Sequence, residues 1–132
     1  MLKPLIYRPK EHEIQAQIVK ILQVCGFEVK ETTAYRQKGP SGCDKGIPDL
    51  LCWHPALGSL CIGLEVKRDQ KAKVTPEQAD MVAQGFYEVV WTVEMALESV
   101  LRALPDDSTL SIANLKARLR GVLGGMNRKE TL

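Results

Sequence analysis

Two short apolar stretches carry the side chains that are best suited to do chemistry in this sequence. Asp49 lies in the first stretch, 46–51, and Glu65 and Lys67 lie in the second, 63–67. Both stretches read as strands joined by a short turn. Alternate residues of a strand point to the same side, so we expect Glu65 and Lys67 on one face with Asp49 alongside. Two carboxylates beside an ammonium group are typical of a site for a hard divalent cation and a phosphate.

Hydrolysis of a phosphodiester is the reaction that such a site favours. The charge of the diester repels hydroxide, whereas Mg²⁺ or Mn²⁺ held by oxygen ligands polarises the phosphoryl oxygen and lowers the pKa of bound water. Lys67 is expected to stay charged beside two carboxylates, which favours an orienting and electrostatic role over that of a general base. Glu-x-Lys is also common on solvated strands, but the apolar flanks here indicate buried charges that need a partner or a metal.

The remaining pattern predicts the helices and strands that hold these stretches in place. Thr75 and Gln78 form a capping-box pattern at the start of one helix. The glycine pair Gly124–Gly125 is expected to end the last helix. The predicted elements are helices over 11–25, 75–84 and 92–104, an amphipathic helix after a break at 105–108, and strands over 27–35, 47–53, 60–67 and 87–91.

Basic residues gather in two irregular segments beside the predicted strands. They are Arg36, Lys38 and Lys45 in the first segment and Arg68, Lys71 and Lys73 in the second. Both segments are candidates for contact with phosphates, and a solvated surface loop is the alternative. The stretch from Lys116 to the C-terminus is also basic. We expect it to be a dimerisation arm or a contact to a nucleic-acid backbone, and packing on the domain is the alternative.

Length and composition predict a globular protein without a membrane span. The chain has 132 residues, 45% of them apolar, and a net charge of only +2, so any attraction to nucleic acid must come from local clusters. No stretch is apolar enough to cross a bilayer and no secretory signal is visible, which predicts a cytoplasmic location. The cysteines are expected to be reduced thiols, with a zinc site of Cys43, Cys52, His54 and Cys61 as an alternative.

The order of the predicted elements resembles the PD-(D/E)XK nuclease superfamily, with an aspartate on the second strand and Glu-x-Lys on the third. Over about residues 11–104 the chain more closely resembles the virus-type replication-repair nuclease (VRR-NUC) family, through Glu13, 46–51, 63–68, Lys73 and Gln78. The resemblance implies an α/β fold with a restriction-endonuclease-like core. Its central mixed β-sheet of about four strands would be flanked by helices in the order α-β-β-β-α-β-α, followed by a C-terminal helix.

The resemblance also implies a role for each motif residue. Four metal ligands follow from it: Asp49, Glu65, the main-chain carbonyl of Val66, and Glu13 directly or through water. Lys67 would position or help activate the attacking water, or stabilise charge on the phosphate. Gln78 matches the polar residue that the family has on the following helix, and a purely capping role for Gln78 is the alternative.

With these roles, the resemblance implies a Mg²⁺- or Mn²⁺-dependent endonuclease that hydrolyses branched or structured DNA such as Holliday junctions or flaps. The nuclease domain would span 1–104, and 105–132 would form the basic C-terminal helix and tail. A symmetric junction suits a two-fold dimer, so a homodimer is expected. The expected setting is DNA repair in a bacterial or phage-infected host cell. The alternative is a non-catalytic module with a nuclease-like fold that binds DNA or a replication partner.

Overall fold

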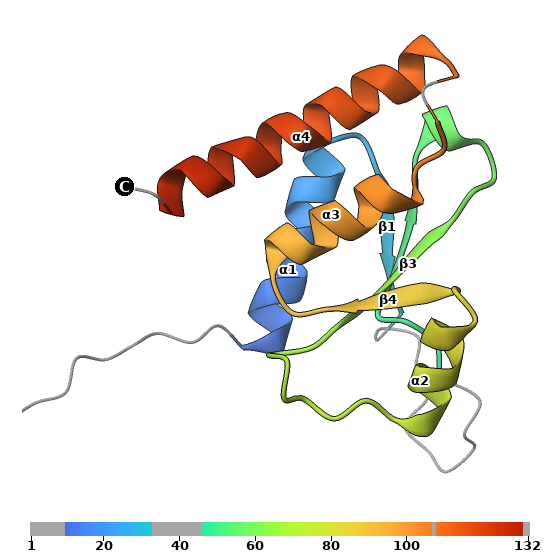
Figure 1. The fold of residues 1–132 in the computed structure, drawn as a ribbon, viewed down its shortest axis with the longest axis vertical. Helices are drawn as coiled ribbons and strands as arrows, with labels where there is room; N and C mark the ends of the chain where they lie inside the picture. Colours follow the sequence, from blue (N-terminus) through green and yellow to red (C-terminus); the bar gives the residue numbers. More distant parts are fainter. Residues whose placement is uncertain (1–9, 33–45, 107, 131–132) are drawn as a thin grey trace, which may run out of the picture.

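The computed structural model describes residues 10–32, 46–106 and 108–130, and within these ranges the chain forms a four-stranded sheet in the order β1-β2-β3-β4 (Figure 1). The strands are β1 (Glu28–Glu31), β2 (Leu50–Trp53), β3 (Ile62–Val66) and β4 (Tyr87–Val90). β2 is antiparallel to both β1 and β3, whereas β3 and β4 are parallel. The predicted α/β class and mixed sheet are confirmed.

The described residues also form four α-helices and one 3₁₀ turn around this sheet. They are α1 (Glu11–Val24), η2 (Pro55–Leu57), α2 (Pro76–Ala83), α3 (Val93–Ala103) and α4 (Leu110–Glu130). Helices α1 and α3 contact each other and β3, and α4 packs on α3 and η2. Helix α2 contacts β4 at the other end of the molecule from α4 (Figure 1). Within the described part of the chain, no helix has the length and apolar character to cross a membrane.

The first helix follows its predicted apolar stripe closely. Ile14, Ile18 and Leu22 are buried, and they recur at the spacing that places side chains on one helical face. The helix ends at Val24, just before Gly26, whose φ of 93° is a conformation that glycine adopts without steric cost. This stripe covers the sheet, so α1 is fixed against the strands that carry the candidate site.

The strands are shorter than the pattern predicted, because loops occupy their ends. β2 begins at Leu50, after Pro48, which has no N–H to give to a strand ladder. Thr32 holds the preceding loop instead: its Oγ1 donates to the carbonyl oxygen of Pro48 at 2.6 Å. β1 ends at Glu31 rather than at residue 35, and 33–35 lie outside the described residues.

All five residues of β3 are buried, which makes it the central strand of the fold. Gly63 allows β3 to approach its neighbours closely. A Cβ atom at this position would lie 2.9 Å from Cβ of Tyr87 and 3.2 Å from Cγ of Pro48. The glycine therefore brings β4 and the loop before β2 close to the strand that carries Glu65.

The expectation that the last helix ends at Gly124–Gly125 is wrong, because α4 continues through both glycines to Glu130. A glycine inside a helix costs roughly 1 kcal/mol relative to alanine. Tertiary packing offsets this cost: Ile112, Leu115 and Leu119 are buried, and Met126, beyond the glycines, packs against the core. The apolar face of α4 therefore packs on the rest of the chain, which is the alternative given above for this C-terminal stretch.

Candidate active site

Asp49 lies directly before β2 and is held from both sides by backbone hydrogen bonds. Its Oδ2 accepts the N–H of Val66 in β3 at 2.8 Å, and its carbonyl oxygen accepts the N–H of Thr32 at 2.9 Å. The side chain is only 3% exposed. Two neighbouring segments of the sheet thus place this carboxylate, which lies one residue before β2 rather than on the strand as predicted.

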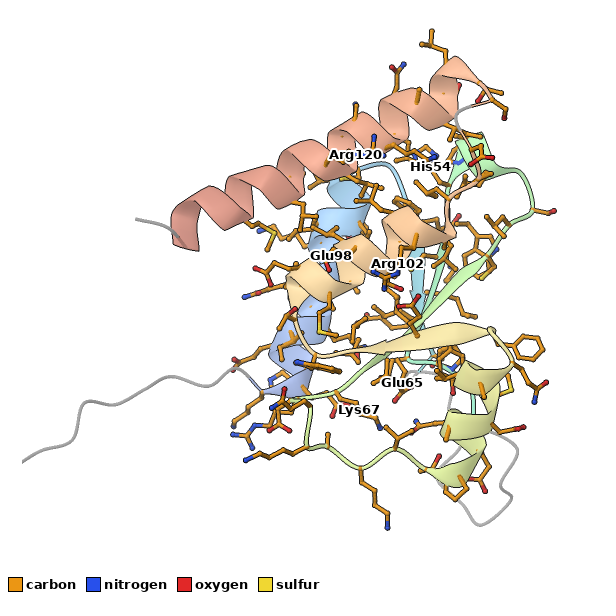
Figure 2. All side chains as sticks on the ribbon, in the orientation of Figure 1. His54, Glu65, Lys67, Glu98, Arg102 and Arg120 are labelled. Atoms are coloured by element: carbon orange, nitrogen blue, oxygen red, sulfur yellow. The ribbon has the colours of Figure 1, made fainter. Side chains whose placement is uncertain are left out.

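Glu65 lies in β3 and is the most buried charged side chain of the site. It is 2% exposed, and its Oε2 lies 3.3 Å from Nζ of Lys67. Glu65 and Lys67 lie near each other below β4 in the view of Figure 2. The alternation of side chains along a strand, which places residues two apart on one face, therefore produces the predicted pair.

The pKa of the Glu65 carboxyl is raised to about 7, with burial as the largest cause. The charge of Asp49 and a hydrogen bond between the two carboxyl groups contribute to this rise, and the nearby Lys67 ammonium opposes it. The three groups together carry one negative charge in excess when both carboxyls are ionised. A divalent cation would remove this excess, which is the physical reason that the pair suits a metal.

Gln78 joins the site from α2 and also caps that helix. Its Oε1 accepts the N–H of Thr75 at 3.1 Å, while its Nε2 donates to Oε2 of Glu65 at 2.9 Å. The capping box is completed by the Oγ1 of Thr75, which accepts the N–H of Gln78. The predicted capping box is confirmed. The Gln78 side chain also contacts Glu65, so a role as a helix cap and a role in the site are compatible.

Substituting Gln78→Glu should destabilise the metal-free protein near pH 8 by roughly 1–3 kcal/mol, because the glutamate keeps an oxygen for the cap but replaces the donor to Glu65 with another carboxylate. Thr75→Ala is the matched control: it removes the cap, at a cost of about 1 kcal/mol, and leaves the donor to Glu65 in place. Urea unfolding in EDTA measures both. No loss of stability in Gln78→Glu, with the expected loss in Thr75→Ala, would show that Gln78 acts only as a cap.

Glu13, the third predicted carboxylate ligand, lies in the first turn of α1. Its Oε2 accepts the N–H of Lys10 at 3.4 Å, as part of a capping interaction. Among the described residues, no three His, Cys, Asp or Glu side chains gather into a group that could hold a metal. The structure thus brings together Asp49, Glu65 and Lys67, while a role for Glu13 and for the carbonyl of Val66 stays a prediction.

The second basic segment follows the site directly. Arg68, Lys71 and Lys73 are exposed in the connection between β3 and α2. The N–H of Lys71 donates to Oδ1 of Asp69 at 2.8 Å, which shapes this turn. Arg36, Lys38 and Lys45, the residues of the first basic segment, lie outside the described residues.

The described residues do not favour the zinc alternative. The two ring nitrogens of His54 contact the carbonyl oxygen of Cys25 and the N–H of Ala56. Cys52 is buried in the hydrophobic core, and the described residues contain no group of three His, Cys, Asp or Glu side chains that could hold a metal. Cys43 lies outside the described residues.

Two residues that bear on the site were not singled out in the sequence. Thr32 fixes the loop before Asp49 through its bond to Pro48, and its only signal was a β-branched residue near a strand end. Trp91 was expected as the end of a buried strand, but it follows β4 and is only half-buried beside the basic segment.

The VRR-NUC resemblance rests on the motif residues alone. A scan against protein-family models, a search of curated proteins and a search of solved structures each found no match to this chain.

Proposed function

We propose that this protein is a metal-dependent endonuclease that hydrolyses DNA phosphodiester bonds, with a restriction-endonuclease-like core. One observation carries the proposal: the buried carboxyl groups of Asp49 and Glu65 meet beside the ammonium group of Lys67. Such a cluster is costly for a protein to maintain without function. The sheet order, with a helix between the parallel strands β3 and β4, supports the same assignment.

The residues present fit a hard divalent cation. Asp49 and Glu65 supply carboxylate oxygens, the ligand type that Mg²⁺ and Mn²⁺ prefer. Bound there, the cation would stabilise charge on the phosphate as a Lewis acid. Part of the rise in the pKa of Glu65 comes from the neighbouring Asp49 carboxylate, and two carboxylates this close favour binding of a cation between them.

The protein's own side chains divide the remaining tasks. Gln78 holds Oε2 of Glu65 in place through its amide. Lys67, whose side chain is 14% exposed, keeps its ammonium group beside Glu65 and presents a positive charge to a phosphate at the edge of the site. The exposed Arg68 and Lys71 extend this positive charge along the connection to α2 and would contact the DNA backbone.

Branched or structured DNA, such as a Holliday junction or a flap, is the proposed substrate, and a homodimer is the proposed state on a symmetric junction. The exposed Arg68, Lys71 and Lys73 beside the site are suited to contact phosphates, so recognition of DNA shape suits this surface better than reading of base sequence.

A cleavage assay tests the proposed function. Purified protein is incubated with a labelled four-way junction and a labelled flap, in Mn²⁺ or in EDTA. We expect cleavage only with Mn²⁺, and a loss of roughly 10³-fold in Asp49→Ala and Lys67→Ala, since each removes several kcal/mol of charge stabilisation. Lys30→Ala, which removes an exposed lysine on β1, is the control and should cleave normally. Cleavage that survives EDTA would contradict the proposal, and DNA binding without cleavage would favour the non-catalytic module.

A further inference from the structure

A pocket of about 460 Å³ opens beside the candidate active site, where α1, the end of β4, the start of α3 and α4 meet. The apolar part of its wall comes from segments far apart in the chain: Ile14, Trp91, Val93 and Met126. Ile14 and Val93 are buried, and Trp91 and Met126 are half-buried. This size and this lining are those of a site for a small organic group rather than of a packing defect.

Polar and charged side chains line the rest of the pocket. Gln17 and Glu94 line the pocket from α1 and α3, and Arg68 and Asp69 line it from the connection after β3. Amide and carboxylate groups can exchange hydrogen bonds with the edge of a planar ring, and the guanidinium group of Arg68 can bind a phosphate bidentately. The pocket therefore offers an apolar interior, hydrogen-bonding groups and a cation together.

Trp91 and Asp69 line both this pocket and a second, smaller hollow. The second hollow has a volume of about 280 Å³ and is lined by Trp91, Asp69, Gln70 and Lys71. Trp91 thus borders both a mostly apolar space and a space beside a lysine. This arrangement of an aromatic platform next to cationic side chains is the one that binds nucleotides of single strands, where bases stack and phosphates meet positive charge.

The pocket is joined to the carboxylate site through the backbone. The N–H of Lys67 donates to the carbonyl oxygen of Val90 at 2.9 Å. Lys67 therefore lies beside Val90, the residue directly before Trp91. Lys67 contacts the carboxylate of Glu65, and its neighbour Arg68 lines the pocket. A nucleotide in the pocket would therefore lie next to a phosphate at the active site.

We propose that this pocket binds an unpaired nucleobase of the DNA substrate, stacked on Trp91, with its phosphate beside Arg68. The inference rests on the proposed function in one respect, namely that the nucleotide belongs to the strand that is cleaved. It narrows the substrate class: DNA with unpaired nucleotides near the scissile phosphate, such as a flap or a frayed branch, is preferred over fully paired DNA. Extrusion of a base from a duplex costs a few kcal/mol, and an already unpaired base avoids this cost.

The chain offers a direct reporter for this proposal, because it contains two tryptophans, Trp53 and Trp91. Trp53 lies in β2 and borders a different hollow, with Gly26 and His54. In full-length Trp53→Phe, the fluorescence of Trp91 alone is followed in EDTA, so that neither metal nor cleavage is involved. The probes are a ten-nucleotide thymidine strand and an abasic strand of equal length and charge.

We expect the thymidine strand to quench Trp91 and to bind about tenfold more tightly than the abasic strand. Trp91→Ala should lose this tenfold preference while it binds the abasic strand as the parent does, and Trp91→Phe should keep part of it. Equal affinities for the two strands, or no change in Trp91 fluorescence, would overturn the pocket assignment. If Trp91→Ala fails to fold, the fluorescence of Trp53→Phe still decides.

The two proposals fail separately in these experiments. Base-dependent quenching in a protein that cleaves no DNA would leave the pocket assignment standing and remove the nuclease assignment. Metal-dependent cleavage together with equal affinity for both strands would leave the nuclease assignment standing and remove the pocket assignment.

Discussion

Glu65→Gln should make the metal-free protein more stable near pH 8 and yet reduce cleavage by roughly 10³-fold. The substitution removes a buried negative charge that Lys67 alone does not balance and that a metal ion would offset. In the variant, Asp49 and Lys67 remain as one carboxylate and one ammonium group, so the excess negative charge of the site disappears. The amide oxygen of the new glutamine can still accept the hydrogen bond from Gln78. The expected gain in the free energy of unfolding is as much as about 3 kcal/mol.

Glu88→Gln is the matched control for this prediction. Glu88 lies on β4 opposite Leu64, is exposed, and pairs with Arg102 on the surface. The same chemical change there should alter stability by less than about 1 kcal/mol and leave cleavage intact. A Glu65→Gln variant that is less stable than the parent in EDTA, or that still cleaves, would show that Glu65 is an ordinary structural residue.

The stability of the metal-free protein should fall as the pH rises from about 4.5 to about 7, and Mn²⁺ should restore it above pH 7. The Glu65 carboxyl has a pKa of about 7 in the folded protein against an ordinary 4.5. Between these values the folded state binds more protons than the unfolded state, so the free energy of unfolding decreases with pH. The stabilisation is complete below pH 4.5 and is lost as the pH passes through 7.

Urea unfolding near pH 5 and pH 8, in EDTA and in Mn²⁺, measures this dependence. The parent protein is compared with Glu65→Gln, because titrating groups distant from this site contribute equally to both and cancel in the difference. The difference between the two proteins should be small near pH 5 and largest near pH 8 in EDTA. A difference that is independent of pH would contradict the raised pKa of Glu65.

Local patterns in the sequence predicted much of what positions the site. The alternation of side chains in a strand placed Glu65 and Lys67 on one face, and the capping box placed Gln78 at the start of α2. Each of these features depends on residues only two or three positions apart. The structure bears them out because nothing distant competes with them.

Features that depend on distant segments could not be predicted in this way. The glycines at 124 and 125 signalled a helix end, but packing of Met126 on the core outweighs their local cost. The pocket at Trp91 forms only because α1, β4 and α4 meet there, so no single stretch encodes it. Whether Gln78 also contacts Glu65 likewise depended on how α2 packs beside the sheet.

The central claim, that Asp49 and Glu65 together bind a divalent cation, is tested most directly by calorimetric titration of the full-length protein with Mn²⁺ near pH 7, in two buffers with different ionisation enthalpies. We predict saturable binding with release of protons, since Glu65 is partly protonated before the cation binds, and loss of this binding in both Asp49→Asn and Glu65→Gln. No heat of binding in the parent protein, or binding in either variant as tight as in the parent, would contradict the account.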